Sequence, residues 1–292
     1  MKKLIATLVV ITFGVSLVSC GSNSLSSLLS GNNGTQGSQT YSYQTAKQYE
    51  SQLLPYKDIL EGMILDKVNQ AREKYWSDYE NTNHVTVPSE KKAALVLSDE
   101  LRKASRDHSQ NIFDHFLLTD PQQKRYKYPN NIATSPYTPH WDDTDNTTPS
   151  DRIRAAYGIV VNGNVITVNG VQVPKMPVTR YGENIYCVDI LELQYHSTLD
   201  SFADYFVSGR ANDPTTGWMN SQTHRDTLLD VCGDGSIPYT PTFQSCKDPI
   251  TGKMVTKPYL NFTGVGLAIS EYNYNGQLGV WVCATQNFVH KN

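Results

Sequence analysis

The sequence lacks the features of several protein classes. Its 25 Lys and Arg are outnumbered by 28 Asp and Glu, so no basic surface for nucleic acid is expected. It has no Gly-x-Ser-x-Gly nucleophile elbow, no Gly-Lys-Ser/Thr phosphate loop and no internal repeat. With 39% hydrophobic residues, including 18 Tyr, 8 Phe and 4 Trp, the 292 residues can fill a sizeable core. We therefore predict a globular protein that does not bind nucleic acid.

The hydrophobic run from Leu4 to Val18 is too short to span a bilayer comfortably and follows two lysines, which is the layout of an export signal. We predict that residues 1–19 are a signal peptide that is removed. The run ends in Leu-Val-Ser-Cys at residues 17–20, which resembles the lipobox of bacterial lipoproteins. The resemblance implies that Cys20 becomes an acylated N-terminus and anchors the protein to a membrane. An ordinary signal peptide with a cysteine near the cleavage site is the alternative.

The next segment has the composition of a tether. Residues 21–40 hold six Ser, four Gly and three Asn without a charged residue, which predicts a flexible linker, and we extend this linker to residue 55. Because Ser22 rather than Asp follows Gly21, the lipoprotein resemblance implies the outer membrane in a Gram-negative cell. The protein is therefore expected in the cell envelope, at the outer membrane or the cell surface.

Export places the other four cysteines in an oxidising compartment, where disulfides are favoured over metal clusters and catalytic thiols. None of them shows Cys-x-x-Cys spacing, so a zinc ribbon is not expected. Four cysteines allow three pairings. Proximity in the sequence favours Cys232 with Cys246, which leaves Cys187 with Cys283.

Apolar residues recur at helical spacing in the first half of the chain. This period predicts helices over residues 57–76 and 99–114, the second with Ser98 as its N-cap. Leu101, Ala104, His108 and Ile112 share the period of the second helix.

The second half contains a short helix over 151–157 and a helical face that ends at Gly209. Two Asn-Gly turns between Val-rich and Ile-rich arms predict a hairpin over 158–173. The segments 264–269 and 278–288 should pair as antiparallel strands around another Asn-Gly turn. Helices first and strands later indicate an α+β fold.

Several separated segments follow one another in a characteristic order: Val68–Arg72, Leu97–Leu101 with Ala104, Tyr181–Tyr186, Trp218–Arg225, Gly264–Gly266 and Gln286–Phe288. In this order they resemble the CAP superfamily (SCP domain), which includes cysteine-rich secretory proteins, antigen 5 and plant pathogenesis-related proteins. The match spans about residues 56–288. The resemblance implies a three-layer α-β-α sandwich with a small antiparallel sheet, formed here by a domain over 56–292 with insertions near 117–138, 158–178 and 232–258.

The resemblance also implies a cleft that holds two His and two Glu. Glu183 matches the first Glu and His224 the second His. His140 precedes Arg152 by twelve residues, near the family spacing, and is preferred as the first His over His115. Ser221 stands at the position of the second Glu, so three members of the four are supported.

Neutral His140 and His224 could bind Zn²⁺ or another divalent metal, with Glu183 as a third ligand or as a hydrogen-bond acceptor that orients a histidine. For Glu183 the alternative is a buried carboxylate that satisfies nearby N–H groups. For His224 it is a residue at a helix start that Ser221 caps.

Four other residues are expected in the cleft, in the core or at polar edges. Asn184 and Trp218 are further cleft residues, with Trp218 expected in the core and its indole N–H bonded. His108 and His115 lie seven apart and are expected at polar edge positions.

Two functions follow from this sequence. The favoured one is a non-enzymatic module that binds a hydrophobic ligand such as a lipid or sterol, a metal, or a partner protein through the CAP cleft. The alternative is a metal-dependent hydrolase, similar to a peptidase, in which Glu183 acts as general base for a metal-bound water. The missing second Glu argues against the hydrolase.

Overall fold

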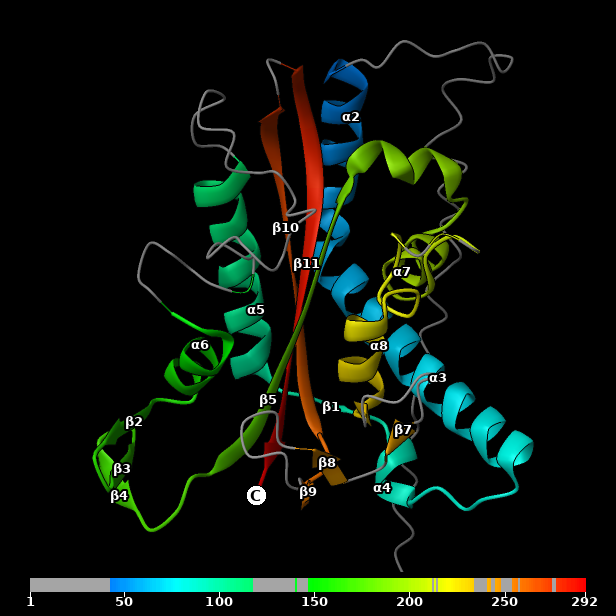
Figure 1. Cartoon of the computed structure of the whole chain (residues 1–292). Helices are drawn as coiled ribbons and strands as arrows, with labels where there is room; N and C mark the ends of the chain where they lie inside the picture. Colours follow the sequence, from blue (N-terminus) through cyan, green and yellow to red (C-terminus); the bar gives the residue numbers. More distant parts are fainter. Residues whose placement is uncertain are drawn as a thin grey trace, which may run out of the picture.

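A central sheet separates two layers of helices in the computed structural model (Figure 1). The structure describes residues 43–117, 140, 147–211, 213, 215–233, 241–242, 245–247, 254–256, 258–274 and 277–292. Helices α5 and α6 cover one face of the sheet, and α2, α3, α7 and α8 cover the other. The predicted α+β class is therefore confirmed, with its three layers. In spatial order the strands are β1 (Val96–Leu97), β10 (Phe262–Tyr274), β11 (Gln277–Lys291) and β5 (Val178–Asp189).

The predicted C-terminal strand pair forms the centre of this sheet. Strands β10 and β11 are antiparallel from Tyr274↔Gln277 to Phe262↔Val289, so both extend beyond the predicted 264–269 and 278–288. Strand β5 pairs antiparallel with β11 and makes one edge of the sheet, and the short β1 pairs parallel with β10 at the other edge. No helix in the described ranges is long and apolar enough to cross a bilayer.

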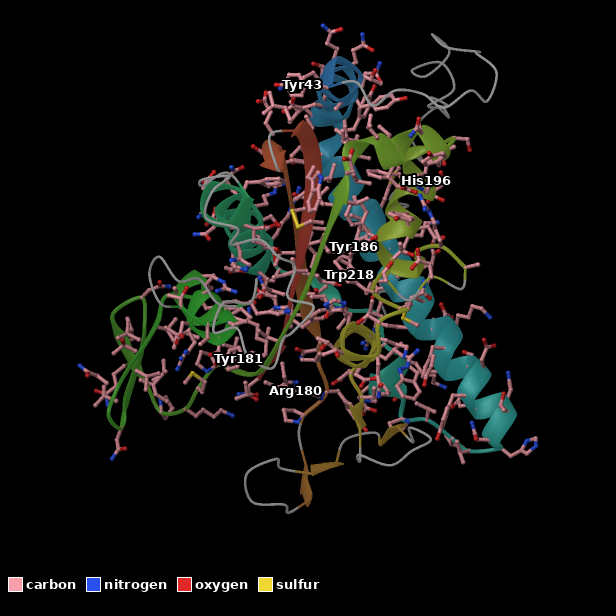
Figure 2. All side chains as sticks on the ribbon, turned by 45° about the horizontal axis from the view of Figure 1, so that its top comes forward. Tyr43, Arg180, Tyr181, Tyr186, His196 and Trp218 are labelled. Atoms are coloured by element: carbon pink, nitrogen blue, oxygen red, sulfur yellow. A yellow bond between two sulfur atoms is a disulfide. The ribbon has the colours of Figure 1, made fainter. Side chains whose placement is uncertain are left out.

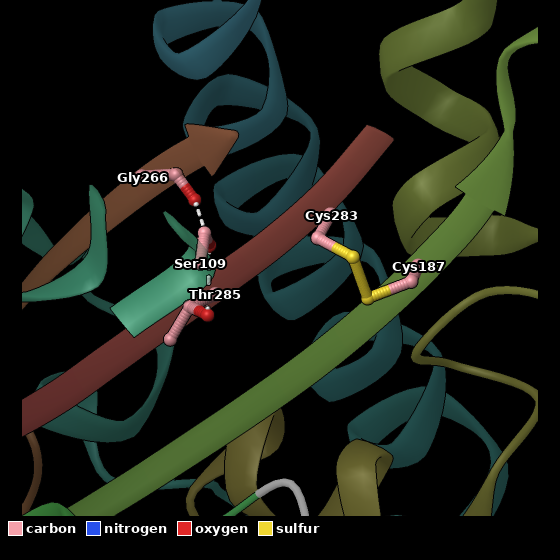
Figure 3. The surroundings of a disulfide bond; sticks show 5 residues. All are labelled: Ser109, Cys187, Gly266, Cys283 and Thr285. Carbon is pink, nitrogen blue, oxygen red and sulfur yellow. Dashed lines mark hydrogen bonds between the residues drawn. A yellow bond between two sulfur atoms is a disulfide. The ribbon is translucent and has the colours of Figure 1, made fainter. Parts of the chain in front are cut away.

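Helix α5 (Asp99–Asn111) lies against β10 because two glycines leave room for its backbone. A Cβ on Gly266 would lie 2.1 Å from the backbone nitrogen of Arg106, which no real contact allows. The Ser109 hydroxyl donates a hydrogen bond to the Gly266 carbonyl at 2.9 Å and lies 2.9 Å from the Thr285 hydroxyl (Figure 3). Small residues on the strand thus bring a helix and its serines into direct contact with the sheet backbone.

The first two predicted helices are present with changed ends. Helix α3 (Lys57–Asn83) runs seven residues beyond the predicted Trp76 and ends at His84, whose φ is 54°. Helix α5 begins after Ser98, whose hydroxyl accepts from the Leu101 N–H as expected. It does not continue to residue 114 as an α-helix, because residues 112–117 form a π-helical turn.

The later helices follow local start and stop signals. Helix α6 (Pro149–Ala156) begins two residues before the predicted 151, because Thr148 forms a capping box with Asp151 and proline fits the first helical position. Helix α7 (Leu199–Ser208) ends at Gly209 as expected, where φ is 64°. The described residues also form α8 (Gln222–Leu229), α4 (Ser89–Lys92) and the 3-10 helix η4 (Ile190–Tyr195).

The predicted hairpin over 158–173 is confirmed and has a third strand. Strands β2 (Ile159–Asn162), β3 (Val165–Val168) and β4 (Val171–Val173) form an antiparallel sheet that projects from the body (Figure 1). The first turn consists of Gly163, at φ 58°, and Asn164, and so lies one residue later than the predicted turn at Asn162 and Gly163. The second turn uses Asn169 and Gly170, both at positive φ, as a tight hairpin requires.

The predicted tether ends too late in the sequence. Helix α2 (Tyr43–Leu53) buries Ala46 and Leu53 in the main core and packs against β11, and the 3-10 helix η1 (Leu54–Tyr56) joins it to α3. The folded domain therefore includes residues 43–55, and the boundary at 56 is wrong. Residues 1–42, with the predicted signal peptide and Cys20, lie outside the described part of the chain.

One of the two predicted disulfides is present. Cys187 on β5 and Cys283 on β11 are directly opposite each other and form a disulfide across the two strands (Figure 3). The side chains of Cys232 and Cys246 are not among those described, so their pairing stays a prediction. Their backbones belong to short two-stranded ribbons of β6 (Cys232–Gly233) with β7 (Pro241–Thr242) and β8 (Ser245–Lys247) with β9 (Met254–Thr256).

Candidate functional site

Glu183 is the centre of a buried cluster of charged and imidazole groups. It lies on β5 opposite Asn287, and only 1% of its side chain is exposed. Nη2 of Arg152 lies 2.9 Å from each carboxylate oxygen. Nδ1 of His140 lies 3.0 Å from Oε1, and Nε2 of His108 lies 3.8 Å from the same atom. A carboxylate, a guanidinium and two imidazoles therefore share one site.

Strand β5 carries Glu183, helix α6 carries Arg152 and helix α5 carries His108. The capping box at Thr148 fixes the start of α6, and this places Arg152 one turn into the helix, facing the sheet. The guanidinium also donates to the backbone carbonyls of Thr147 and His140, each at 3.1 Å. Arg152 thus holds His140 against β5 as well as neutralising Glu183.

The surroundings keep Glu183 ionised. Burial raises its pKa, but the charge of His108, the hydrogen bond from His140 and the charge of Arg152 lower it by more. The pKa of Glu183 is therefore below its ordinary value. A carboxylate in this state accepts hydrogen bonds and holds no proton to give to a substrate.

His140 lies against Glu183, and the choice of His140 over His115 stays a prediction. His140 touches Glu183 and keeps 37% of its side chain exposed, so it can meet both the buried acid and a ligand from solvent. The backbone of His115 belongs to the π-helical turn after α5, and its side chain is not described.

His224 lies in the first turn of α8 and is joined to the sheet through its backbone. The side-chain amide of Asn184 donates to the His224 carbonyl at 3.0 Å, which ties α8 to β5. Burial, together with the charge of His140, lowers the pKa of the His224 imidazole to about 4. His224 is therefore neutral at pH 7 and lies within electrostatic reach of His140. In the described ranges no hydrogen bond or ion pair joins it directly to Glu183.

The sequence interpretation missed two members of the cluster. His108 was expected at a polar edge, and this is wrong because only 1% of the residue is exposed. The burial of His108 could have been predicted from the helical period that it shares with Leu101 and Ile112, which are also buried. In the sequence, Arg152 serves only as the reference point for the spacing of His140, and its own role is not indicated. Its ion pair could not be predicted because it depends on how α6 docks on β5.

Two other predicted cleft residues have structural roles. Ser221 occupies the N-cap position of α8, but its side chain makes no capping hydrogen bond there. Trp218 is fully buried in the main core, as expected (Figure 2). The expected partner for its indole N–H is not found, since within the described residues Nε1 has no acceptor.

The arrangement around Glu183 does not fit a three-ligand metal site as it stands. Both oxygens of Glu183 already accept from the guanidinium of Arg152, and a divalent cation would be repelled by that charge. Among the described residues no group of three His, Cys, Asp or Glu side chains is placed to hold a metal ion. Binding of Zn²⁺ by His140 and His224 stays a prediction.

Comparisons with known protein families, with curated proteins and with solved structures found no match for this chain. The likeness to the CAP superfamily thus rests on the motifs named above and on their positions. The Gly-Glu-Asn-Ile segment lies in β5, and the Trp-x5-His-Arg segment leads into α8, beside that strand.

Proposed function

We propose that this protein is a lipid-anchored CAP-superfamily module of the bacterial cell envelope, which binds a ligand at the cleft around Glu183 without catalysing a reaction. Three expectations are part of this proposal: export, acylation of Cys20 and the CAP assignment. The ligand classes that the resemblance implies are a lipid or sterol, a divalent metal and a partner protein. The half-exposed ring of His140 is the group at this cleft that a ligand would meet.

The observation that carries the proposal is the ion pair between Arg152 and Glu183. A general base needs a carboxylate oxygen with a free lone pair directed at water or substrate. Here each oxygen of Glu183 accepts a hydrogen bond from a guanidinium, and one of them also contacts His140. Glu183 is thus engaged in holding the cleft together, which favours a binding role over the hydrolase.

Metal titration and an activity screen test the cleft. The mature chain with Cys20→Ala, purified without chelator, would be titrated with Zn²⁺ by calorimetry, and its bound lipid would be extracted and identified. Variants His140→Ala and His224→Ala should abolish any zinc binding, and His84→Asn, at the exposed end of α3, should leave it intact. Zinc-dependent hydrolysis of a peptide or ester that is lost in Glu183→Gln and in both histidine variants would contradict the proposal.

Membrane fractionation tests the anchor. The full-length chain should partition into the detergent phase, and Cys20→Ala should move it to the aqueous phase, because acyl chains provide the membrane affinity. Ser19→Ala is the matched control, since it changes the neighbouring residue and leaves the acylated cysteine in place. A Cys20→Ala chain that still partitions with detergent would reject acylation.

A further inference from the structure

A second hollow lies between the start of β5 and helix α8. It has a volume of about 340 Å³ and is lined on one side by Arg180 and Gly182 and on the other by Thr223 and Asp226 of α8. Gly182 lets α8 approach β5 closely beside the hollow, because a Cβ there would lie 2.8 Å from a methyl group of Thr227. This volume is in the usual range for small-molecule sites.

This hollow is separate from the Glu183 cluster. Consecutive residues of a strand point to opposite faces of the sheet. Gly182 therefore faces α8, and Glu183 faces α5 and α6, where it contacts Arg152. Figure 2 shows Arg180 and Tyr181 near the beginning of β5.

Arg180 is placed by an irregularity in the sheet. In the pairing of β5 with β11, Val289 is opposite Tyr181 and His290 is opposite Thr179, so Arg180 is the extra residue of a β-bulge. Its φ is 53°, a left-handed conformation that is costly for a residue with a side chain. Bulges of this kind change the direction of a side chain and are frequent beside functional sites. Here the bulge puts a guanidinium on the wall of a cavity.

A buried carboxylate holds the guanidinium in place. Nη1 of Arg180 forms an ion pair with Asp230 and donates to the Pro258 carbonyl at 3.0 Å. Asp230 is fully buried, also has a positive φ of 59°, and accepts from the Leu260 N–H at 2.7 Å. Within the described part of the chain, the hydrogen bond of the Arg180 guanidinium is made by Nη1, and 14% of the side chain is exposed. Part of a rigidly held side chain thus remains open to a ligand.

Asp230 is not the partner of Arg180 alone. It also attracts the buried guanidinium of Arg72, and Nζ of the buried Lys91 lies 4.0 Å from Oδ2. Burial lowers the pKa of Lys91 to about 7, so the permanent cations here are the two guanidiniums. Among the described residues they share the carboxylate of Asp230, so the charge of Arg180 is only partly compensated. An anion in the hollow would supply the missing negative charge. Asp226, on the opposite wall, would repel an anionic group at its own end of the hollow.

We propose that this hollow binds a small molecule that carries a carboxylate or phosphate group at the Arg180 end. The planar guanidinium fork suits an oxyanion better than any other ligand. The first turn of α8 adds to the attraction, because Ser221 does not cap it with its side chain. The site is independent of the proposed function of the Glu183 cleft.

The test uses inorganic phosphate as the probe, titrated into the mature chain with Cys20→Ala and followed by two-dimensional NMR. Binding should be saturable and should shift the resonances of β5 and α8. Arg180→Gln should weaken it at least about tenfold, and Asp226→Asn should tighten it at least about twofold, because a repelling charge is removed. Arg210→Gln, an exposed arginine paired with Glu192, is the control and should bind phosphate unchanged. A parallel titration with acetate separates phosphate from carboxylate recognition.

Opposite effects of the two wall variants distinguish binding from misfolding. Arg180→Gln leaves Lys91 and Arg72 beside Asp230, so the fold should survive, and its NMR spectrum reports this directly. Arg180→Lys, which keeps the charge but loses the fork, should retain part of the affinity. Equal phosphate affinity in wild type, Arg180→Gln and Asp226→Asn would overturn the proposal, as would shifts that do not saturate.

Discussion

Arg152 donates from one nitrogen to both carboxylate oxygens of Glu183, 2.9 Å away in each case, although the two residues are 31 positions apart. The pair joins α6 to the edge strand β5 and is almost entirely closed to solvent, with 11% and 1% of the side chains exposed. The pair limits what this site can do, because Glu183, which the sequence offers as a base or metal ligand, is already neutralised. The pair also makes the stability of the domain depend on both partners.

Replacing Arg152 with Met should destabilise the domain by about 3–5 kcal/mol, because Glu183 would stay buried without its main cationic partner. The free energy of unfolding in urea measures this effect. Glu183→Gln combined with Arg152→Met should cost less than the sum of the single changes, since the pair acts as a unit.

Arg154→Met is the matched control on the same helix. Arg154 pairs with Asp151, and 31% and 39% of these side chains are exposed. An ion pair in that setting contributes about 1 kcal/mol or less. If Arg152→Met and Arg154→Met cost the same, the ion pair with Glu183 would not have the importance assigned to it.

His224 should make stability depend on pH in the acid range. Its pKa is about 4 in the folded protein and about 6.5 when unfolded, so between these values the unfolded chain binds more protons. Its contribution is fully present above pH 6.5 and is lost as the pH falls towards 4, by up to about 3 kcal/mol. Unfolding of wild type and His224→Gln from pH 4 to 7, with chelator present, measures this. An unchanged pH profile in His224→Gln would contradict the neutral buried state.

Two glycines should respond in opposite directions to alanine. Gly62 lies on the exposed side of α3 with nothing within 4 Å of an added Cβ, so Gly62→Ala should stabilise by about 0.5–1 kcal/mol. Gly266→Ala would place a Cβ 2.1 Å from the Arg106 nitrogen and 2.5 Å from the Ser105 carbonyl carbon. It should destabilise by about 3 kcal/mol or more, because α5 must move off the sheet. Thermal unfolding of both variants tests the packing, and a tolerated Gly266→Ala would refute the close approach.

The disulfide between Cys187 and Cys283 closes a segment with a sequence separation of 96. Replacing both cysteines with Ala should lower stability by about 2–5 kcal/mol, mainly by freeing the unfolded chain. Urea unfolding with and without reductant measures this. Any effect of reductant that persists in the double variant would report the predicted bond between Cys232 and Cys246. A double variant as stable as wild type would contradict a structural role for the cross-strand bond.

Signals that act over a few residues could be predicted from the sequence. Ser98 caps α5 and Gly209 ends α7, because a cap or stop depends on the backbone next to it. The strand pair β10 and β11 followed from the Asn-Gly dipeptide that lies between its two arms in the sequence. The predicted tether extends too far because sequence signals near residues 43–55 do not report distant contacts. Helix α2 is polar in sequence, and its docking of Ala46 and Leu53 on the main core depends on residues more than 200 positions away.

At the candidate site, too, local motifs were informative and contacts between distant elements were not predictable. The motif around Gly182 placed Glu183 on a strand, and spacing to Arg152 selected His140, and the two residues are in contact. His108 was visible only as part of an apolar period, and its distance to Glu183 depends on α5 packing closely enough on two glycines of β10.

The sequence by itself determined the mixed class, the Ser98 cap, the end of α7 and the hairpins, and it favoured the pairing of Cys187 with Cys283, because each depends on local backbone preference or on few alternatives. The tertiary structure alone decided that Arg152 neutralises Glu183 and that Arg180, at a bulge, pairs with a buried Asp230. The physical reason is that burial and charge pairing depend on how whole elements dock, and docking brings together side chains that are tens to hundreds of residues apart.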